Sequence, residues 1–216
     1  MSKNTIFATD KDGNEITIGQ VENWIADKEK AKLATLVYDR LYGRYLKPFD
    51  FEDAEYEKSY KNGFAIMANC CLLIEAFISF QEPGLKSTYR NSERCFGIFF
   101  TTQDRFKDLS NDGLSAAQYK NLEFRMNRNN KGIPKEFYTD VRCGILHSGE
   151  TRNNWKIVRS GEFFDEANRR INATKFMNRL KYSISDFKKE LKKEDFDTSI
   201  KWKIYIEKLK HVILNA

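Results

Sequence analysis

Arg142 and His147 are the two side chains whose types and spacing most directly suggest chemistry. The chain contains 2 histidines, and His147 follows Arg142 in the segment FYTDVRCGILHSGET. If this segment is helical, five steps of about 100° place the two side chains about 140° apart, flanking one edge of the helix. Arginine offers a fixed positive fork to phosphate oxygens, and histidine exchanges a proton near neutral pH. Together they could act on a phosphodiester bond without a metal.

RNA carries its own nucleophile for such a reaction, the 2'-hydroxyl group. A base removes its proton, an acid protonates the departing 5'-oxygen, and a cation stabilises the charge on the phosphoryl oxygens. We expect His147 to carry the proton and Arg142 to stabilise the charge, giving a 2',3'-cyclic phosphate and a 5'-hydroxyl. No acidic pair is joined by a histidine at ligand spacing, so we expect neither a metal nor a cofactor.

Two other interpretations of this segment stay open. A lone histidine on an apolar helix is more often a core residue than a catalytic one. Cys143 could be a thiol activated by its cationic neighbour, although no G-x-C turn or supporting Asn-His pattern accompanies it. The second histidine, His211, has no arginine at matching spacing, and we interpret it as structural.

The composition indicates what must position these residues. The chain has 216 residues, 41% of them hydrophobic, 31% charged and only 3 prolines, which is typical of one helix-rich globular domain over residues 1–216. A net charge of +6 favours polyanionic partners such as RNA. The polar start of the chain shows no signal peptide, and the 4 cysteines form no CxxC pair, so we expect free thiols and a cytoplasmic location.

The periodicity of apolar residues predicts a mainly α fold. Residues 5–18 alternate around a turn and predict a short hairpin, an appendage over residues 1–20. A small β-hairpin is expected at 155–164, after the helix of Arg142 and His147. Further helices are predicted at 21–46, 53–80, within 85–109, at 114–127 and 168–192, and as a closing C-terminal helix within 196–214.

Glu75 lies in the most apolar of these helices. Its segment, 64–80, is too short to span a membrane and also carries Asn69, so a core helix and no membrane contact are expected. A carboxylate in such a stretch needs a partner, and Arg142 and His147 are the candidate cations. Alternatively, Glu75 lies at the helix surface or binds another lysine or arginine.

Several cations border the segment of Arg142 and His147 and could meet phosphate groups. The candidates for RNA binding are Arg125, Arg128, Lys131 and Arg152. The first three lie in a polar loop that could equally be a plain connection. Arg94 and Arg105 belong to a stretch that is either a solvated face or the border of an RNA path.

The motif Arg142-Cys-Gly-Ile-Leu-His147 resembles the Arg-x4-His signature of HEPN domains. Residues 140–151 look like the final core helix of bacterial members, residues 69–75 resemble its partner helix, and the likeness extends over about residues 50–182. The resemblance implies a HEPN-like helical bundle acting as a metal-independent endoribonuclease, and a toxin or phage-defence effector with an antitoxin or other defence protein as partner. It also implies a homodimer whose two motifs share one cleft. We expect Glu75, Asn69 and Cys143 to support Arg142 and His147.

The motif departs from the family pattern at two positions. Many active members carry a polar residue directly after the arginine, where this chain has Cys143. Members modified by a partner nucleotidyltransferase carry a tyrosine two positions after the histidine, where this chain has Gly149, so that modification is not expected. The alternative functions are a non-catalytic HEPN-like module that binds RNA or a protein, and a DNA-binding helical protein.

Overall fold

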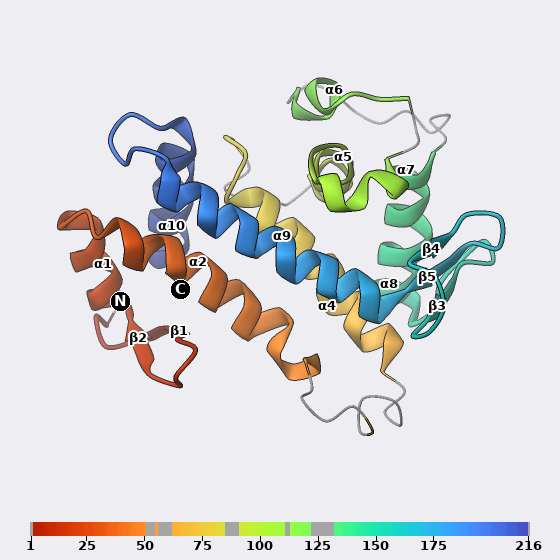
Figure 1. Ribbon diagram of the computed structural model, residues 1–216, viewed down its shortest axis with the longest axis horizontal. Helices are drawn as coiled ribbons and strands as arrows, with labels where there is room; N and C mark the ends of the chain where they lie inside the picture. Colours follow the sequence, from red (N-terminus) through yellow and green to blue (C-terminus); the bar gives the residue numbers. More distant parts are fainter. Residues whose placement is uncertain are drawn as a thin grey trace.

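The computed structural model describes residues 2–50, 55, 62–84, 91–110, 113–121 and 132–215, and this part of the chain is mainly helical with two small sheets (Figure 1). The elements are β1 Ile6–Thr9, β2 Glu15–Thr17, α1 Ile18–Ala26, α2 Lys30–Tyr45, η1 Lys47–Phe49, α4 Gly63–Ser79, α5 Ser92–Thr102, η2 Asp104–Leu109, α6 Ala116–Lys120, α7 Ile133–Glu136, η3 Phe137–Arg142, α8 Cys143–Ser148, β3 Lys156–Val158, β4 Phe164–Asp165, β5 Arg170–Asn172, α9 Ala173–Lys193 and α10 Ile200–Leu214. The prediction of a mainly helical fold is confirmed.

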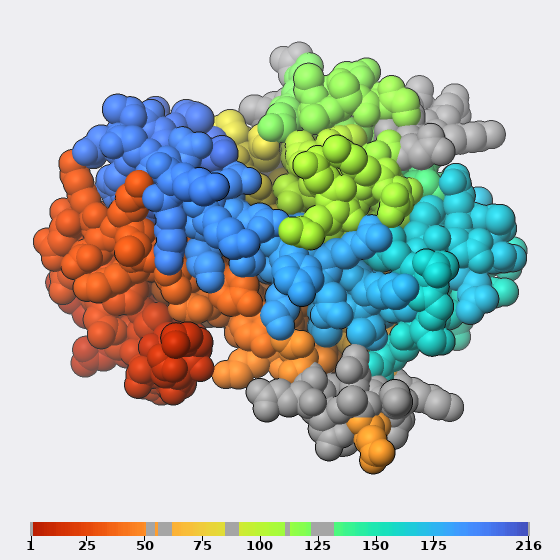
Figure 2. Space-filling model, in the orientation of Figure 1, coloured from red at the N-terminus to blue at the C-terminus, as the bar shows by residue number. Residues whose placement is uncertain are grey.

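Helix α9 is the centre of the fold, since it packs against both α2 and α4. Figure 2 shows its surface as a blue band between the orange of α2 and the yellow-green of α5. Its buried stripe repeats every three to four residues, at Phe176, Leu180, Ile184, Phe187 and Leu191. This spacing puts them on one face of the helix, which therefore buries a continuous apolar stripe. The lysines exposed on the rest of the helix are Lys175, Lys189, Lys192 and Lys193.

A cluster of aromatic rings connects α9 to the helical segment of Arg142 and His147. The Phe137 ring of η3 stacks on the Phe176 ring of α9 with centroids 5.5 Å apart. Phe100 of α5 contacts the Phe137 ring edge-on at 5.1 Å. These rings are fully buried, and such contacts add to the free energy of apolar burial. We call the continuous helical segment of α7, η3 and α8, residues 133–148, the motif helix. These ring contacts fix its first half to the core.

Helix α10 lies across the end of the central helices. Its Tyr205 hydroxyl donates to the carbonyl oxygen of Leu33 in α2 at 2.8 Å. The Trp202 indole N–H donates to the carbonyl oxygen of Leu191 in α9 at 2.9 Å. Both side chains are fully buried with their polar atoms satisfied. The predicted C-terminal helix is therefore present and attached to two others.

The N-terminal region confirms one prediction and corrects another. Strands β1 and β2 form the expected antiparallel hairpin. The single helix expected at 21–46 is wrong, because α1 and α2 are separate helices. Thr17 caps the first with a reciprocal Gln20 bond, and Lys28 between the helices has a φ of 53°. A left-handed residue cannot continue a right-handed helix, so the chain turns there.

The hairpin expected at 155–164 is wrong in its pairing. Strand β3 runs parallel to β5, and β4 runs antiparallel to β5, so β5 lies between them. The residues of β5 were expected to begin the next helix. Instead Asn172 ends the strand, and its side chain accepts from the Lys175 N–H at 3.0 Å as the N-cap of α9.

Helix α4 begins at Gly63 rather than near Asp53. Residues 51–54 and 56–61 lie outside the described part of the chain, as do 122–127 of the helix expected at 114–127, of which α6 forms the described part. None of the helices in the described ranges is long and apolar enough to cross a membrane.

Candidate functional site

Arg142 and His147 lie on one continuous helical segment made of α7, η3 and α8. Residues Phe137–Arg142 form a π-helical turn, and Cys143–Ser148 continue as α-helix. Such wide turns inside helices are rare and often lie at functional sites. Gly149, with a φ of 72°, ends the segment and donates its N–H to the Ile145 carbonyl at 3.1 Å. A glycine with a positive φ angle is a common residue at such a helix end.

Glu75 of α4 binds Arg142 directly. Its Oε1 accepts from the arginine Nε at 2.8 Å and lies 2.7 Å from Nη2. Its second oxygen, Oε2, accepts from the Ser92 hydroxyl of α5 at 2.8 Å. The carboxylate therefore joins three helical elements. Of the alternatives for Glu75, the structure contains the ion pair with Arg142.

This ion pair is largely withdrawn from water. The side chain of Glu75 is 9% exposed and that of Arg142 is 14% exposed. Burial alone would lower the pKa of Arg142, but the adjacent Glu75 carboxylate raises the pKa above its ordinary value. The guanidinium also lies 5.5 Å from the centre of the Tyr138 ring, where a cation is attracted by the ring face. Arg142 is thus held as a permanent, oriented cation.

His147 has the opposite environment. Its side chain is exposed on the last turn of α8, and no hydrogen bond or ion pair reaches it from the described residues. The interpretation of His147 as a buried core residue is therefore wrong. No hydrogen bond among the described residues joins His147 to Arg142.

Among the other expected supporting residues, Cys143 lies close to the arginine and Asn69 does not. The Cys143 sulfur is 3.9 Å from the Arg142 Nη1, the nitrogen that Glu75 does not engage. Asn69 donates instead to the Ala65 carbonyl of its own helix at 2.9 Å. Ser92, which donates to the second oxygen of Glu75, was not predicted from the sequence, because a serine after an asparagine is not a distinctive pattern.

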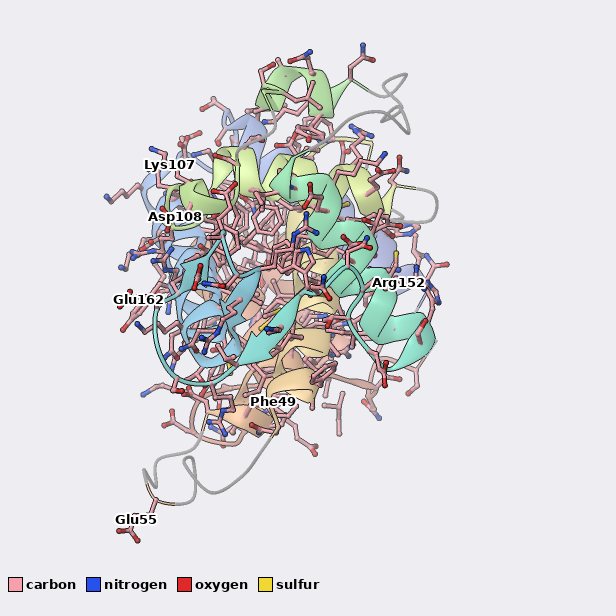
Figure 3. The ribbon with its side chains drawn as sticks, turned by 90° about the vertical axis from the view of Figure 1, so that its right-hand side faces the viewer. Phe49, Glu55, Lys107, Asp108, Arg152 and Glu162 are labelled. Atoms are coloured by element: carbon pink, nitrogen blue, oxygen red, sulfur yellow. The ribbon has the colours of Figure 1, made fainter. Side chains whose placement is uncertain are left out.

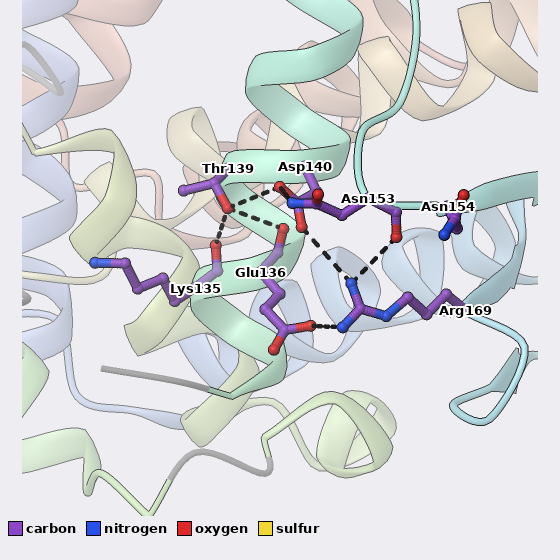
Figure 4. Close-up of a pocket in the computed structure, with 7 residues that line it drawn as sticks. All are labelled: Lys135, Glu136, Thr139, Asp140, Asn153, Asn154 and Arg169. Carbon is purple, nitrogen blue, oxygen red and sulfur yellow. Dashed lines mark hydrogen bonds and ion pairs between the residues drawn. The ribbon is translucent and has the colours of Figure 1, made fainter. Parts of the chain in front are cut away.

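Asp140 is a second buried carboxylate on the motif helix, and sequence reasoning also missed it. It is 5% exposed and accepts from the Asn153 side-chain N–H at 3.0 Å (Figure 4). Its backbone carbonyl accepts from the Arg152 N–H at 2.9 Å. The signal that could have found it is an acidic residue next to the apolar Val141, two positions before Arg142. Through these two bonds Asp140 holds the loop of Arg152 and Asn153 against the helix that precedes it.

This loop borders a polar cavity of about 690 Å³ beside the motif helix (Figure 4). Asn153, Asn154 and Arg169, which line it, have positive φ angles of 49°, 63° and 50°. Arg169 binds Glu136 of α7 at 3.1 Å and lies 4.0 Å from Asp140. Two of these left-handed residues, Asn153 and Arg169, are therefore stabilised by bonds to the helix, which keeps the helix end and the loop in one arrangement.

Of the four cations expected to bind RNA, the structure describes Arg152. Arg152 is exposed beside α8, and it donates to the Ser148 hydroxyl at 3.1 Å (Figure 3). Arg125, Arg128 and Lys131 lie outside the described residues.

Two further arginines belong to the stretch at 85–109, for which a solvated face and the border of an RNA path were the alternatives, and residues 85–90 of it lie outside the described part of the chain. Arg94 is 6% exposed and donates to the carbonyl oxygens of Tyr119 and Lys120. It thereby fixes α6 to α5. Arg105 binds Asp186 of α9 at 2.8 Å. Within the described ranges, no group of three histidine, cysteine or acidic side chains is placed to hold a metal ion.

Comparison with protein-family models, with curated proteins and with solved structures finds no match to this chain. The resemblance to HEPN domains therefore depends on the motif of Arg142 and His147 and its helical setting, and it stays a prediction.

Proposed function

We propose that this protein is a HEPN-type, metal-independent endoribonuclease. His147 moves the proton between the 2'-hydroxyl and the departing 5'-oxygen, and Arg142 stabilises the negative charge that grows on the phosphoryl oxygens. The products are a 2',3'-cyclic phosphate and a 5'-hydroxyl. A role as a toxin or phage-defence effector, with an antitoxin or other defence protein as its partner, belongs to the same proposal.

The observation that carries the proposal is the exposed imidazole of His147 on a helix fixed by the Glu75 ion pair. A histidine that packs in the core would be buried, whereas His147 is open to solvent and accessible to a ligand. Catalysis needs reacting groups on rigid elements, and Glu75 supplies that rigidity by binding two nitrogens of Arg142. The Nη1 nitrogen contacts the Cys143 sulfur at 3.9 Å and not Glu75, and its second N–H can donate to a phosphate oxygen.

One histidine per protomer is too few for separate acid and base roles, so the proposal includes a two-fold homodimer. The outer face of α4 supports such contact. Phe64 and Leu72 on this helix are 42% and 41% exposed, and Leu72 precedes Glu75 by one helical turn. Isologous packing of α4 and the adjacent α8 would bury these apolar groups and bring the second His147 near the first ion pair.

A non-catalytic RNA- or protein-binding module is the second candidate, and one observation favours it. The Arg142 side chain is 14% exposed and already neutralised by a carboxylate. A neutralised guanidinium attracts phosphate less strongly than a free one. In such a module the motif helix would serve only to hold the fold, and the exposed face of α4 would receive the partner.

Incubation with RNA in EDTA separates the two candidates. We expect the wild-type protein to produce cyclic-phosphate ends and His147→Ala to reduce the rate at least about 100-fold, because proton transfer contributes on that order. His211→Ala is the matched control, since His211 lies on α10, where its ring is close to the Asn215 side chain. Equal cleavage by wild type and His147→Ala would exclude the histidine from the reaction, and no cleavage by either would favour the binding module.

The dimer has a separate test. Leu72→Glu places a charge on the outer face of α4, where the side chain is already exposed. We expect light scattering to show a monomer and cleavage to be lost. Ile200→Glu changes an apolar side chain that is 64% exposed on α10, and it should leave both mass and cleavage unchanged.

A further inference from the structure

The cleft between strand β1 and helix α2 has a marked excess of positive charge. The hairpin lies beside α2 (Figure 1), and the cleft has a volume of about 600 Å³. The cations along it are Lys11, Arg40, Arg44, Lys47 and Lys181. Lys181 is paired with Asp50, and Lys11 lies 3.6 Å from Asp12. Three cations, Arg40, Arg44 and Lys47, therefore remain for the two acidic residues that also line the cleft.

Those two acidic residues, Asp10 and Asp39, do not neutralise the arginines. Asp10 accepts from the backbone N–H groups of Asp12 and Asn14 at 2.9 and 2.8 Å, and from the Asn14 side chain. Its carboxylate is therefore occupied within its own turn. Burial raises the pKa of Asp39, and no ion pair joins it to Arg40 or Arg44.

Arg40 is the most unusual of these cations, because it is 8% exposed and has no carboxylate partner among the described residues. Its guanidinium lies 3.7 Å from the centre of the Phe7 ring and donates from Nη1 to the Phe7 carbonyl. Its other nitrogens have no partner in the described part of the chain. Burial and the nearby Arg44 lower the pKa of Arg40 to about 10. Buried charges are normally paired, so this one lacks an anion.

Arg44 lies one helical turn after Arg40 and lines the same cleft. It is exposed, and it forms no ion pair with the described residues. Two like charges one turn apart repel each other. An anion between them would replace repulsion with attraction, and two guanidinium forks match the oxygens of a phosphoryl group.

We propose that this cleft binds the phosphoryl group of a small phosphorylated molecule, held between Arg40 and Arg44 with Lys47 at the rim. The cleft volume is within the range of small-molecule sites. A terminal phosphoryl group can reach the nearly buried Arg40, whereas a phosphate inside a nucleic-acid strand carries bulky sugars on both sides. The site is independent of the proposed ribonuclease activity, because it needs neither Arg142 nor His147.

Binding, not cleavage, is the appropriate measurement. Arg40 and Arg44 also line a second cavity of about 340 Å³ that reaches Glu75, so their substitution could alter Arg142 indirectly. Calorimetric titrations with inorganic phosphate, pyrophosphate, AMP and ATP at constant ionic strength distinguish a site for phosphoryl oxygens alone from one that also holds a nucleoside. Chloride and a short RNA without terminal phosphates serve as ligand controls.

We expect saturable binding of at least one phosphoryl compound, weakened about tenfold or more by Arg44→Gln and by Arg40→Met. Arg44 is exposed, so its substitution leaves the fold intact. Arg40→Met keeps an apolar side chain over the Phe7 ring but removes the charge and the bond to the Phe7 carbonyl, so circular dichroism of the ligand-free variant checks that its fold is retained. Arg170→Gln, an exposed arginine on β5, should bind as the wild type does.

Three results would overturn the proposal. The first is no saturable binding of any phosphoryl compound, and the second is binding that survives both substitutions unchanged. The third is Arg44-dependent binding of the RNA control alone, which would make the cleft a nucleic-acid surface.

Discussion

The Arg142 guanidinium and the Glu75 carboxylate form a buried ion pair that joins two helices distant in the sequence. Two nitrogens of Arg142 share the Glu75 Oε1, and Ser92 takes the other oxygen. Neither residue reaches water freely. Removing one partner would therefore leave the other charge or dipole buried without compensation, which costs far more than losing an exposed pair.

Glu75→Gln should lower the free energy of unfolding by about 2 kcal/mol or more, because the amide keeps the shape but not the charge that Arg142 needs. The urea midpoint at pH 7 measures the loss. Glu190→Gln is the control, since Glu190 is 53% exposed in its pair with Lys201, and it should cost no more than about 0.5 kcal/mol. Equal effects of the two substitutions would contradict the importance of the buried pair.

Some of this site could be predicted from residue chemistry. A carboxylate in an apolar helix needs a cation, and Glu75 has one of the two that the sequence suggested. Gly149 ends the motif helix where its freedom to adopt a positive φ predicts. The buried stripe of α9 follows from the three-to-four-residue spacing of Phe176, Leu180 and Ile184. These features depend on local spacing or on one strong physical requirement.

Other features depend on contacts between distant segments, which spacing does not encode. The short strand β5 pairs in parallel with β3 across an intervening loop, and its residues read equally well as the start of a helix. The turn at Lys28 between α1 and α2 contains neither glycine nor proline, so the sequence does not predict it. Arg94 is a basic residue in a basic stretch, yet tertiary packing buries it against two carbonyl groups of α6.

Gly144→Ala should destabilise the end of the motif helix. A Cβ atom at this position would lie 2.4 Å from the Glu150 carbonyl oxygen and 3.2 Å from the Thr151 Cα. Both are backbone atoms, so the loop after α8 would have to move, at a cost of about 1–3 kcal/mol. Gly43→Ala, in an open position of α2, should instead stabilise by about 0.5–1 kcal/mol. In thermal unfolding followed by circular dichroism, the melting temperature should fall for Gly144→Ala and rise for Gly43→Ala.

The four cysteines should differ sharply in reactivity. Cys70, Cys71 and Cys95 are buried, while Cys143 is partly exposed. Burial raises the pKa of the Cys95 thiol to about 12 and raises those of Cys70 and Cys71 as well, so little reactive thiolate forms at pH 8. Iodoacetamide should therefore label Cys143 first in the native protein and all four in urea. Peptide mass spectrometry that finds early labelling of Cys71 would refute this packing.

Asp140→Ala should loosen the loop after the motif helix without unfolding the protein. The substitution removes the acceptor of the Asn153 bond at 3.0 Å and the charge that faces Arg169. Because Asn153 has a positive φ, its conformation needs such outside support. We expect a loss of about 1–3 kcal/mol in the free energy of unfolding, since a buried hydrogen-bonded carboxylate is lost.

Hydrogen exchange measures this loosening directly. Amides of residues 149–155 should exchange faster in Asp140→Ala, while those of α2 and α9 keep their protection, because the lost bonds are local to the loop. Asp165→Ala provides the control. Asp165 also accepts from an asparagine side chain, that of Asn168 at 2.9 Å. Because Asp165 ends strand β4 and this bond lies within the turn that follows, the substitution should leave exchange at 149–155 unchanged. Uniformly faster exchange throughout Asp140→Ala would instead mean that Asp140 supports the whole core, because local loss of an anchor cannot expose the amides of α9.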